Sequence, residues 1–134
     1  MNQFSLPSAA CIGYGTIDAE HQDIIDFVNS NVRLLRQGPR RDIVGLFEPL
    51  RHLMAHHFRN EEQLMRDTGF PGLIGHRGQH EGLLLRIDDL WRLCAARGRV
   101  DLNDAVTCFD SVIDDILRAD LPFKTFLHEQ GILR

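Results

Sequence analysis

The sequence has few of the features that mark a secreted, membrane-spanning or disulfide-bonded protein. Its three cysteines, Cys11, Cys94 and Cys108, are odd in number and far apart, so they form neither a disulfide framework nor a C-x-x-C motif. Reduced thiols in a cytosolic protein are the expected state. No apolar run is long enough to span a membrane, and residues 1–10 lack the basic and apolar regions of a signal peptide. We therefore expect a cytoplasmic protein with no membrane partner.

The sequence also lacks a large excess of either charge, which narrows the range of possible partners. The 134 residues carry a formal net charge of -4 and show no basic stripe, so no nucleic-acid partner is expected. An apolar fraction of 43% and a charged fraction of 25% are ordinary for a globular protein and exclude a disordered or low-complexity chain. A chain of this length suits a single core. We predict one domain over residues 1–134.

Apolar residues recur with helical period in four long segments that follow an irregular N-terminal arm. The arm, residues 1–15, contains prolines and glycines that interrupt any period, and the bundle is expected over residues 16–134. Capping and punctuation signals predict helices over residues 18–37, 40–67, 71–97 and 102–127. Their short connections force neighbouring helices to run antiparallel. The prediction is an all-α, up-down-up-down four-helix bundle.

Three of the expected helices contain residues that disfavour helix, and in the fourth helix this residue is Pro122, near its end. Pro49 lies inside the second helix and should kink or divide it, because proline lacks the N–H and clashes with the preceding turn. The first half of the third helix is weakened by Gly72, Gly75, Gly78 and Gly82. Something beyond local propensity must therefore hold that helix. Trp91, further along it, is expected in the core.

Polar residues interrupt the apolar stripes of all four helices. A soluble bundle buries apolar side chains there, so inward histidines and carboxylates are the informative observation. In the second and third helices they form two pairs at i and i+4, each stacked on one face. The residues on inward stripes are His21, His57, Glu61, His76, His80 and Asp120. Asp115 lies on the apolar flank of the fourth stripe and is expected to point inward as well.

The same periodicity assigns other polar residues to the surface. His52 and His56 also lie at i and i+4, but they share their side of the second helix with Arg59 and other polar residues. Asp110 and Asp114 line up with polar residues of the fourth helix. All four are expected to face water.

The inward imidazoles and carboxylates require a compensating charge. Buried without one, they would cost several kcal/mol each, against a net stability of about 5–15 kcal/mol for a domain. Four imidazoles and three carboxylates are too many ligands for one tetrahedral zinc ion, but they suit two iron ions bridged by carboxylates. The alternative is a set of independent core histidines, each hydrogen-bonded to a carboxylate.

The order of these motifs resembles the hemerythrin family, in particular its single-domain bacterial members. Residues 17–22, IDAEHQ, look like the family's first-helix motif, and residues 57–62, HFRNEE, resemble its H-F-x-x-E-E motif. In residues 70–80, F-P followed by H-x-x-x-H resembles the third motif. The resemblance covers nearly the whole chain with highly specific spacing. It implies two non-haem iron ions, joined by an oxo or hydroxo bridge, and reversible binding of dioxygen.

The resemblance also implies a role for each inward residue. One iron would have His21 and His57 as terminal ligands, and the other would have His76 and His80. Glu61 and Asp120 would be the bridging carboxylates.

The last helix departs from the family pattern at Asp115. Where the family has H-I-x-x-x-D, residues 115–120 read D-I-L-R-A-D. As a ligand, Asp115 gives the second iron a 2-His-1-carboxylate set, the type found in non-haem iron oxygenases. Its charge should favour ferric iron, with easier oxidation and poorer reversibility. Alternatively, Asp115 is too short to reach iron and holds a water or a ligand histidine. Val112 and Ile116 are candidates for lining a ligand pocket.

Three functions remain open on this reasoning. The first is a protein that stores, delivers or senses dioxygen or a similar small ligand, and the second is a di-iron oxidase or peroxidase. The third is a vestigial site whose metal only fixes the bundle.

Overall fold

Four α-helices make up the described part of the computed structural model, which covers residues 15–38 and 43–132. The description excludes the side chains of residues 43, 44, 111, 112, 115 and 116. The helices are α1 (Gly15–Leu35), α2 (Ile43–Thr68), α3 (Leu73–Arg97) and α4 (Leu102–Glu129). No strand longer than an isolated bridge residue occurs within these ranges.

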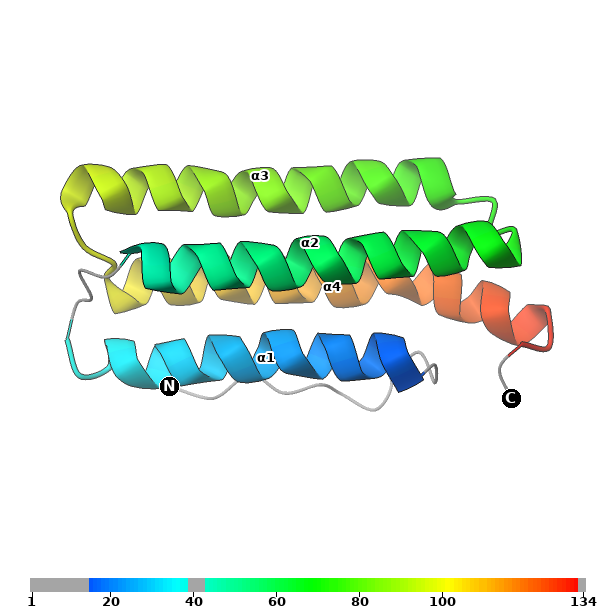
Figure 1. Cartoon of the computed structure of the whole chain (residues 1–134), viewed down its shortest axis with the longest axis horizontal. Coiled ribbons are helices and arrows are strands. Elements are labelled where there is room, and N and C mark those ends of the chain that lie inside the picture. Colours follow the sequence, from blue (N-terminus) through cyan, green and yellow to red (C-terminus); the bar gives the residue numbers. More distant parts are fainter. Residues whose placement is uncertain (1–14, 39–42, 133–134) are drawn as a thin grey trace.

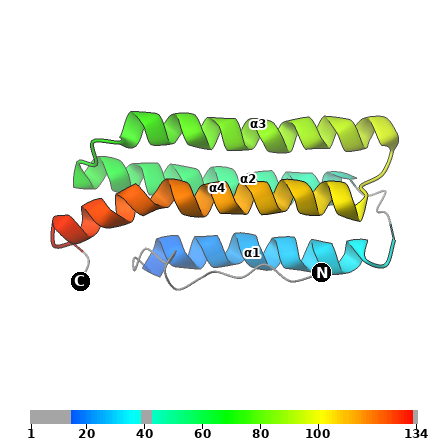
Figure 2. The same cartoon turned by 180° about the vertical axis from the view of Figure 1, so that it is seen from behind.

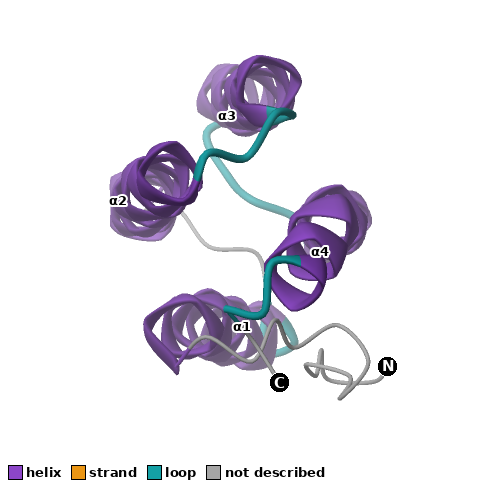
Figure 3. Ribbon diagram, turned by 90° about the vertical axis from the view of Figure 1, so that its right-hand side faces the viewer, coloured by secondary structure: helices purple, strands orange, loops and turns teal. Residues whose placement is uncertain are grey.

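The four helices lie side by side as an antiparallel bundle (Figures 1 and 2). Seen along its length, the bundle has α1 opposite α3 and α2 opposite α4, so each helix packs against its two neighbours (Figure 3). The all-α bundle predicted from the sequence is confirmed. α1 begins at Gly15 rather than Asp18, and α3 begins at Leu73 rather than Pro71. The expected start of the second helix, residue 40, lies outside the described residues.

Two glycine turns make the antiparallel path possible. Gly69 after α2 and Gly98 after α3 adopt φ of +74° and +72°, a left-handed conformation that side chains other than hydrogen disfavour. After each turn the chain donates back to the helix it leaves, from Phe70 N to Met65 O at 2.9 Å and from Arg99 N to Cys94 O at 3.2 Å. These bonds satisfy the last carbonyls and reverse the chain within a few residues.

The expected division of the second helix does not occur, because α2 continues through Pro49. Proline inside a helix costs about 3 kcal/mol in local terms. Leu46, Phe47 and Leu50 on either side of it are buried in the core. Their packing outweighs the local cost.

The apolar core is divided into two clusters. The larger fills most of the bundle and includes Val28, Met54, Ile87 and Phe109. The smaller cluster, near the N-terminus of α1, consists of Ile17, Met65, Phe123 and Leu127. On each helix the inward polar residues lie between members of the two clusters. The sequence pattern therefore builds a single polar layer across the bundle.

The prediction of a core position for Trp91 is wrong, because its side chain is 41% exposed. Leu90 and Cys94 take the inward positions on that stretch of α3, and a residue one step from Leu90 is turned about 100° away from it. Among the described helices, none is both long and apolar enough to cross a membrane.

Candidate metal centre

Three helices contribute histidines and two contribute carboxylates to the polar layer. α1 supplies His21, α2 supplies His57 and Glu61, α3 supplies His76 and His80, and α4 supplies Asp120. Each of these six side chains is no more than 4% exposed. Their ligand atoms form two groups, and within each group they lie within 4.8 Å of one another. Both groups contain Glu61 and Asp120.

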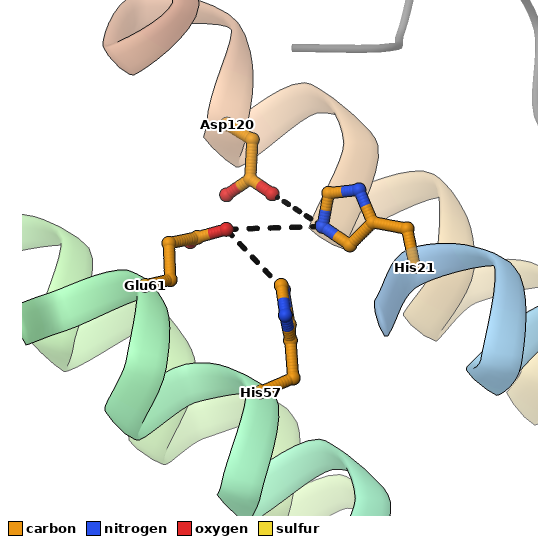
Figure 4. A group of neighbouring side chains, drawn as sticks. All are labelled: His21, His57, Glu61 and Asp120. Carbon is orange, nitrogen blue, oxygen red and sulfur yellow. Dashed lines mark ion pairs between the residues drawn. The ribbon is translucent and has the colours of Figure 1, made fainter. Parts of the chain in front are cut away.

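The first group joins α1, α2 and α4 (Figure 4). Nε2 of His21 lies 2.8 Å from Oδ2 of Asp120 and 3.7 Å from Oε2 of Glu61. Nε2 of His57 lies 3.2 Å from the same Oε2 of Glu61. Both imidazoles and both carboxylates therefore point into one small space.

The second group joins α2, α3 and α4. Nε2 of His76 lies 2.6 Å from Oε1 of Glu61 and 3.0 Å from Oδ1 of Asp120. Nε2 of His80 lies 3.2 Å from Oε1 of Glu61. The two carboxylates thus divide their oxygens: Oε2 and Oδ2 face the first pair of histidines, and Oε1 and Oδ1 face the second. This is the arrangement by which two carboxylates bridge two cations.

Hydrogen bonding alone does not account for the first group. Nε2 of His21, Nε2 of His57, Oε2 of Glu61 and Oδ2 of Asp120 are buried without a hydrogen-bond partner in the described structure, as is Oδ1 of Asp120 on the side of the second group. These atoms are close to one another but are not oriented to share a proton. Unsatisfied buried polar atoms cost about 1–3 kcal/mol each. Lone pairs that converge on a common point are what a cation requires, so these residues fit a metal site better than independent hydrogen-bonded histidines.

Without a bound cation, protons neutralise the layer. Burial lowers the pKa of His57, but the carboxylates of Glu20 and Glu61 outweigh it and raise that pKa to about 9. Burial likewise lowers the pKa of His76, which Asp120 and Glu61 raise to about 9. Burial raises the pKa of Glu61, yet the surrounding histidines hold it well below its usual value. Burial and the charge of Glu61 raise the pKa of Asp120.

Two further carboxylates, which the sequence reasoning did not assign, orient the histidines from outside. Oε1 of Glu20 lies 3.0 Å from Nδ1 of His57, and Oε2 of Glu62 lies 2.8 Å from Nδ1 of His80. An Nδ1–H donated to a carboxylate leaves the Nε2 lone pair available for a cation. The sequence feature that could have pointed to these two glutamates is their position, because Glu20 directly precedes His21 and Glu62 directly follows Glu61.

These outer carboxylates are themselves held in place. Asn60 donates to Oε2 of Glu20 at 2.5 Å, and Nε of Arg77 lies 3.2 Å from Oε1 of Glu62. The ring of Phe58 stacks on that of His80 with a centroid distance of 3.9 Å. Packing and hydrogen bonds therefore hold the rings of His57 and His80 with Nε2 directed toward Glu61.

The residues assigned to the surface lie there. His52, His56, Asp110 and Asp114 are exposed, which confirms that prediction. The side chains of Asp115, Val112 and Ile116, although on α4, lie outside the described residues.

A small cavity beside the first group is lined by other residues of the same stretch. It has a volume of about 10 Å³, and its walls are His21, Ile24, Ile25, Ile113 and Leu117. A cavity of about this size holds one water-sized molecule.

Comparison with known proteins agrees with this geometry. A family model described as the hemerythrin HHE cation binding domain matches residues 12–119. That range contains the four histidines and Glu61 and ends before Asp120, whose place in the layer rests on the structure. The bacteriohemerythrin of Stenotrophomonas maltophilia (strain R551-3) is 32% identical over 95 residues, 69% of this chain. The chain spans 60% of the length of that relative.

Removing metal should make the stability of the protein depend on pH. His57 and His76 have pKa values raised from 6.5 to about 9, so the folded state holds protons more tightly than the unfolded state. The stability that these two histidines add is fully present at pH values below their pKa in the unfolded state. It is lost as pH rises through their pKa in the folded state. We expect the free energy of unfolding of the metal-free protein, measured with urea, to fall between about pH 6 and about pH 10. A free energy of unfolding that stays constant or rises across that range would contradict the raised pKa values of His57 and His76.

Loss of an outer carboxylate should weaken metal binding without altering the ligand set. Glu20→Gln and Glu62→Gln each remove the charge that orients a histidine, and we expect an affinity about 10–100-fold lower. Competition with a chromophoric chelator measures this affinity. The control is Glu81→Gln, an exposed glutamate on α3. Equal affinities of the Glu20 variant and this control would exclude the orienting role.

Proposed function

This chain belongs to the hemerythrin family, and on that premise we propose that it binds two non-haem iron ions and, through them, dioxygen or a similar small ligand. Storage, delivery and sensing of the ligand are all compatible uses. The proposed ligands of one iron are His21 and His57, and those of the other are His76 and His80. Glu61 and Asp120 would bridge the two ions. Asp115 would join the second set.

The observation that supports this proposal most strongly is the division of carboxylate oxygens. Glu61 and Asp120 each present one oxygen to the histidines of α1 and α2 and the other to those of α3. A single-ion site would have no use for two such sets. Bundle proteins commonly build di-iron centres from side chains of this kind on facing helices.

The surroundings suit a small, weakly polar ligand. The cavity of about 10 Å³ beside His21 is bounded by Ile24, Ile25, Ile113 and Leu117, so its walls other than His21 are apolar. Iron held there would supply an open coordination position for such a ligand. The small volume of the cavity restricts the size of what binds there.

A second candidate function is a di-iron oxidase or peroxidase, and the identity of residue 115 favours it. An aspartate in place of a histidine adds a negative charge, which stabilises ferric iron in a poorly screened interior. Turnover is the distinguishing property. Repeated consumption of peroxide or dioxygen in the presence of a reductant supports the enzyme, whereas uptake that stops at one ligand per centre supports the binding protein.

Metal content tests the core of the proposal. We expect elemental analysis of protein loaded with ferrous iron and desalted to find two irons per chain, and His57→Ala to lower that content. The control is His52→Ala, which removes an exposed histidine from the same helix. Zinc or a single ion in the native protein, or equal iron content in the two variants, would contradict a di-iron site built on His57.

The effect of Asp115 on reversibility is tested separately by replacing it with histidine. Iron-loaded, anaerobically reduced protein should be oxidised by dioxygen without recovery of its reduced absorption spectrum on degassing. Asp115→His should recover over repeated cycles, because the neutral imidazole removes the charge that favours ferric iron. Repeated recovery by the native protein would show that Asp115 does not control reversibility.

A further inference from the structure

A second, much larger space lies on the face of the bundle between α3 and α4, at the level of the polar layer. A cleft of about 650 Å³ opens between α3 and α4, and Gly75, His76, Gly82, Arg86 and Arg118 are among its walls. This volume falls within the range of about 300–1,000 Å³ typical of small-molecule sites. A diatomic molecule would leave most of it empty.

Glycines of α3 keep this cleft open. A Cβ added at Gly75 or Gly82 would meet no atom within 4 Å, and neither residue has a positive φ. Close packing and backbone conformation therefore do not require glycine at either position. Each glycine weakens the helix relative to alanine, as the sequence already indicated. Their common structural consequence is an unfilled wall on the α3 side of the cleft.

The polar part of the lining favours an anion. It includes two arginines, Arg86 and Arg118. Nε of Arg118 lies 3.1 Å from Oδ2 of Asp114, one turn away on the exposed side of α4. Exposed pairs of this kind stabilise little, so Arg118 can exchange Asp114 for a ligand carboxylate at small cost. The planar guanidinium binds carboxylates through two parallel hydrogen bonds.

The cleft reaches the polar layer at His76. This side chain is 4% exposed and lines the cleft, while its Nε2 lies 2.6 Å from Glu61. Phe70, Leu83 and Pro122 add apolar surface to the lining. A molecule in the cleft would have an apolar part against these residues and lie beside a member of the candidate metal centre.

We propose that the cleft between α3 and α4 binds a small organic anion. The carboxylate of this anion binds an arginine of the cleft. The apolar part of the anion lies along Gly75 and Gly82, beside His76. The site is distinct from the cavity next to His21, and it does not depend on which metal the centre holds.

Benzoate is the probe, and benzamide is its neutral analogue of the same shape. In calorimetric titrations of the full chain, as purified, we expect one benzoate per chain. Benzamide and inorganic phosphate should each bind at least about tenfold more weakly, because one lacks the charge and the other lacks the apolar body. Phosphate binding as tight as benzoate binding would overturn the proposal, because the apolar lining would then contribute nothing.

Matched leucine substitutions on α3 locate the binding. Gly82→Leu places a side chain in the cleft and should weaken benzoate binding at least about tenfold. A Cβ added at Gly78 also meets no atom within 4 Å, but Gly78 is not among the residues that line the cleft, so Gly78→Leu should bind benzoate like the native chain. Both variants should melt no lower than the native protein, since leucine favours helix over glycine. Equal benzoate affinity in the two variants would place the ligand elsewhere.

Arg118→Gln provides a test that does not depend on filling the cleft. It should lower benzoate affinity about tenfold and leave benzamide binding unchanged. Measurements are repeated after removal of metal. Benzoate binding that disappears with the metal and is indifferent to Gly82→Leu would assign the probe to the metal centre and overturn the cleft proposal, while leaving the di-iron proposal intact. Binding that persists without metal and is lost in Gly82→Leu supports the cleft, whatever the metal proves to be.

Discussion

Two carboxylates, Glu61 and Asp120, lie at the centre of the bundle with almost no exposure to water, and their charge governs what surrounds them. An uncompensated carboxylate in such a place would cost several kcal/mol, so every oxygen must face a proton or a cation. Histidines approach from two sides to meet this demand. In the proposed metal-bound state they would act as neutral ligands. Without it, protons neutralise the layer, and raised pKa values near 9 at His57 and His76 are the consequence.

The remainder of the fold confines this charge to one level of the bundle. A large apolar cluster lies on one side of the layer, and the small cluster around Phe123 closes the other. The left-handed glycines Gly69 and Gly98 lie at the reversals of chain direction that bring α2, α3 and α4 to the same level. Glu20 and Glu62 extend this pairing of charges toward the surface, because each accepts a hydrogen bond from a histidine Nδ1 and is held by a second polar residue.

Helical period was enough to predict the bundle and to separate buried His57 from exposed His52, because burial on one face of a helix is a local property of the sequence. Partners on different helices are not local. Glu20 and His57 are 37 residues apart and meet only once α1 and α2 are packed, so the period could not reveal their contact. The continuity of α2 through Pro49 and the exposure of Trp91 also depend on packing. The sequence showed that the glycines of α3 lower its helix propensity. The cleft beside them could not be predicted, because it also depends on the position of α4.

The cavity beside His21 and the cleft beside His76 differ in the size of the molecule that each can hold. Beside His21 the cavity of about 10 Å³ admits one molecule the size of water, whereas beside His76 the cleft of about 650 Å³ admits an organic molecule. Occupants of the two spaces need not compete, because α1 and His21 bound one and α3 and His76 bound the other, although α4 lines both. A negative charge in the cleft acts at short range on His76, and His76 in turn contacts both carboxylates that join the halves of the layer. An anion held there therefore changes the electrostatic field at the whole centre while the cavity beside His21 stays available to a small ligand.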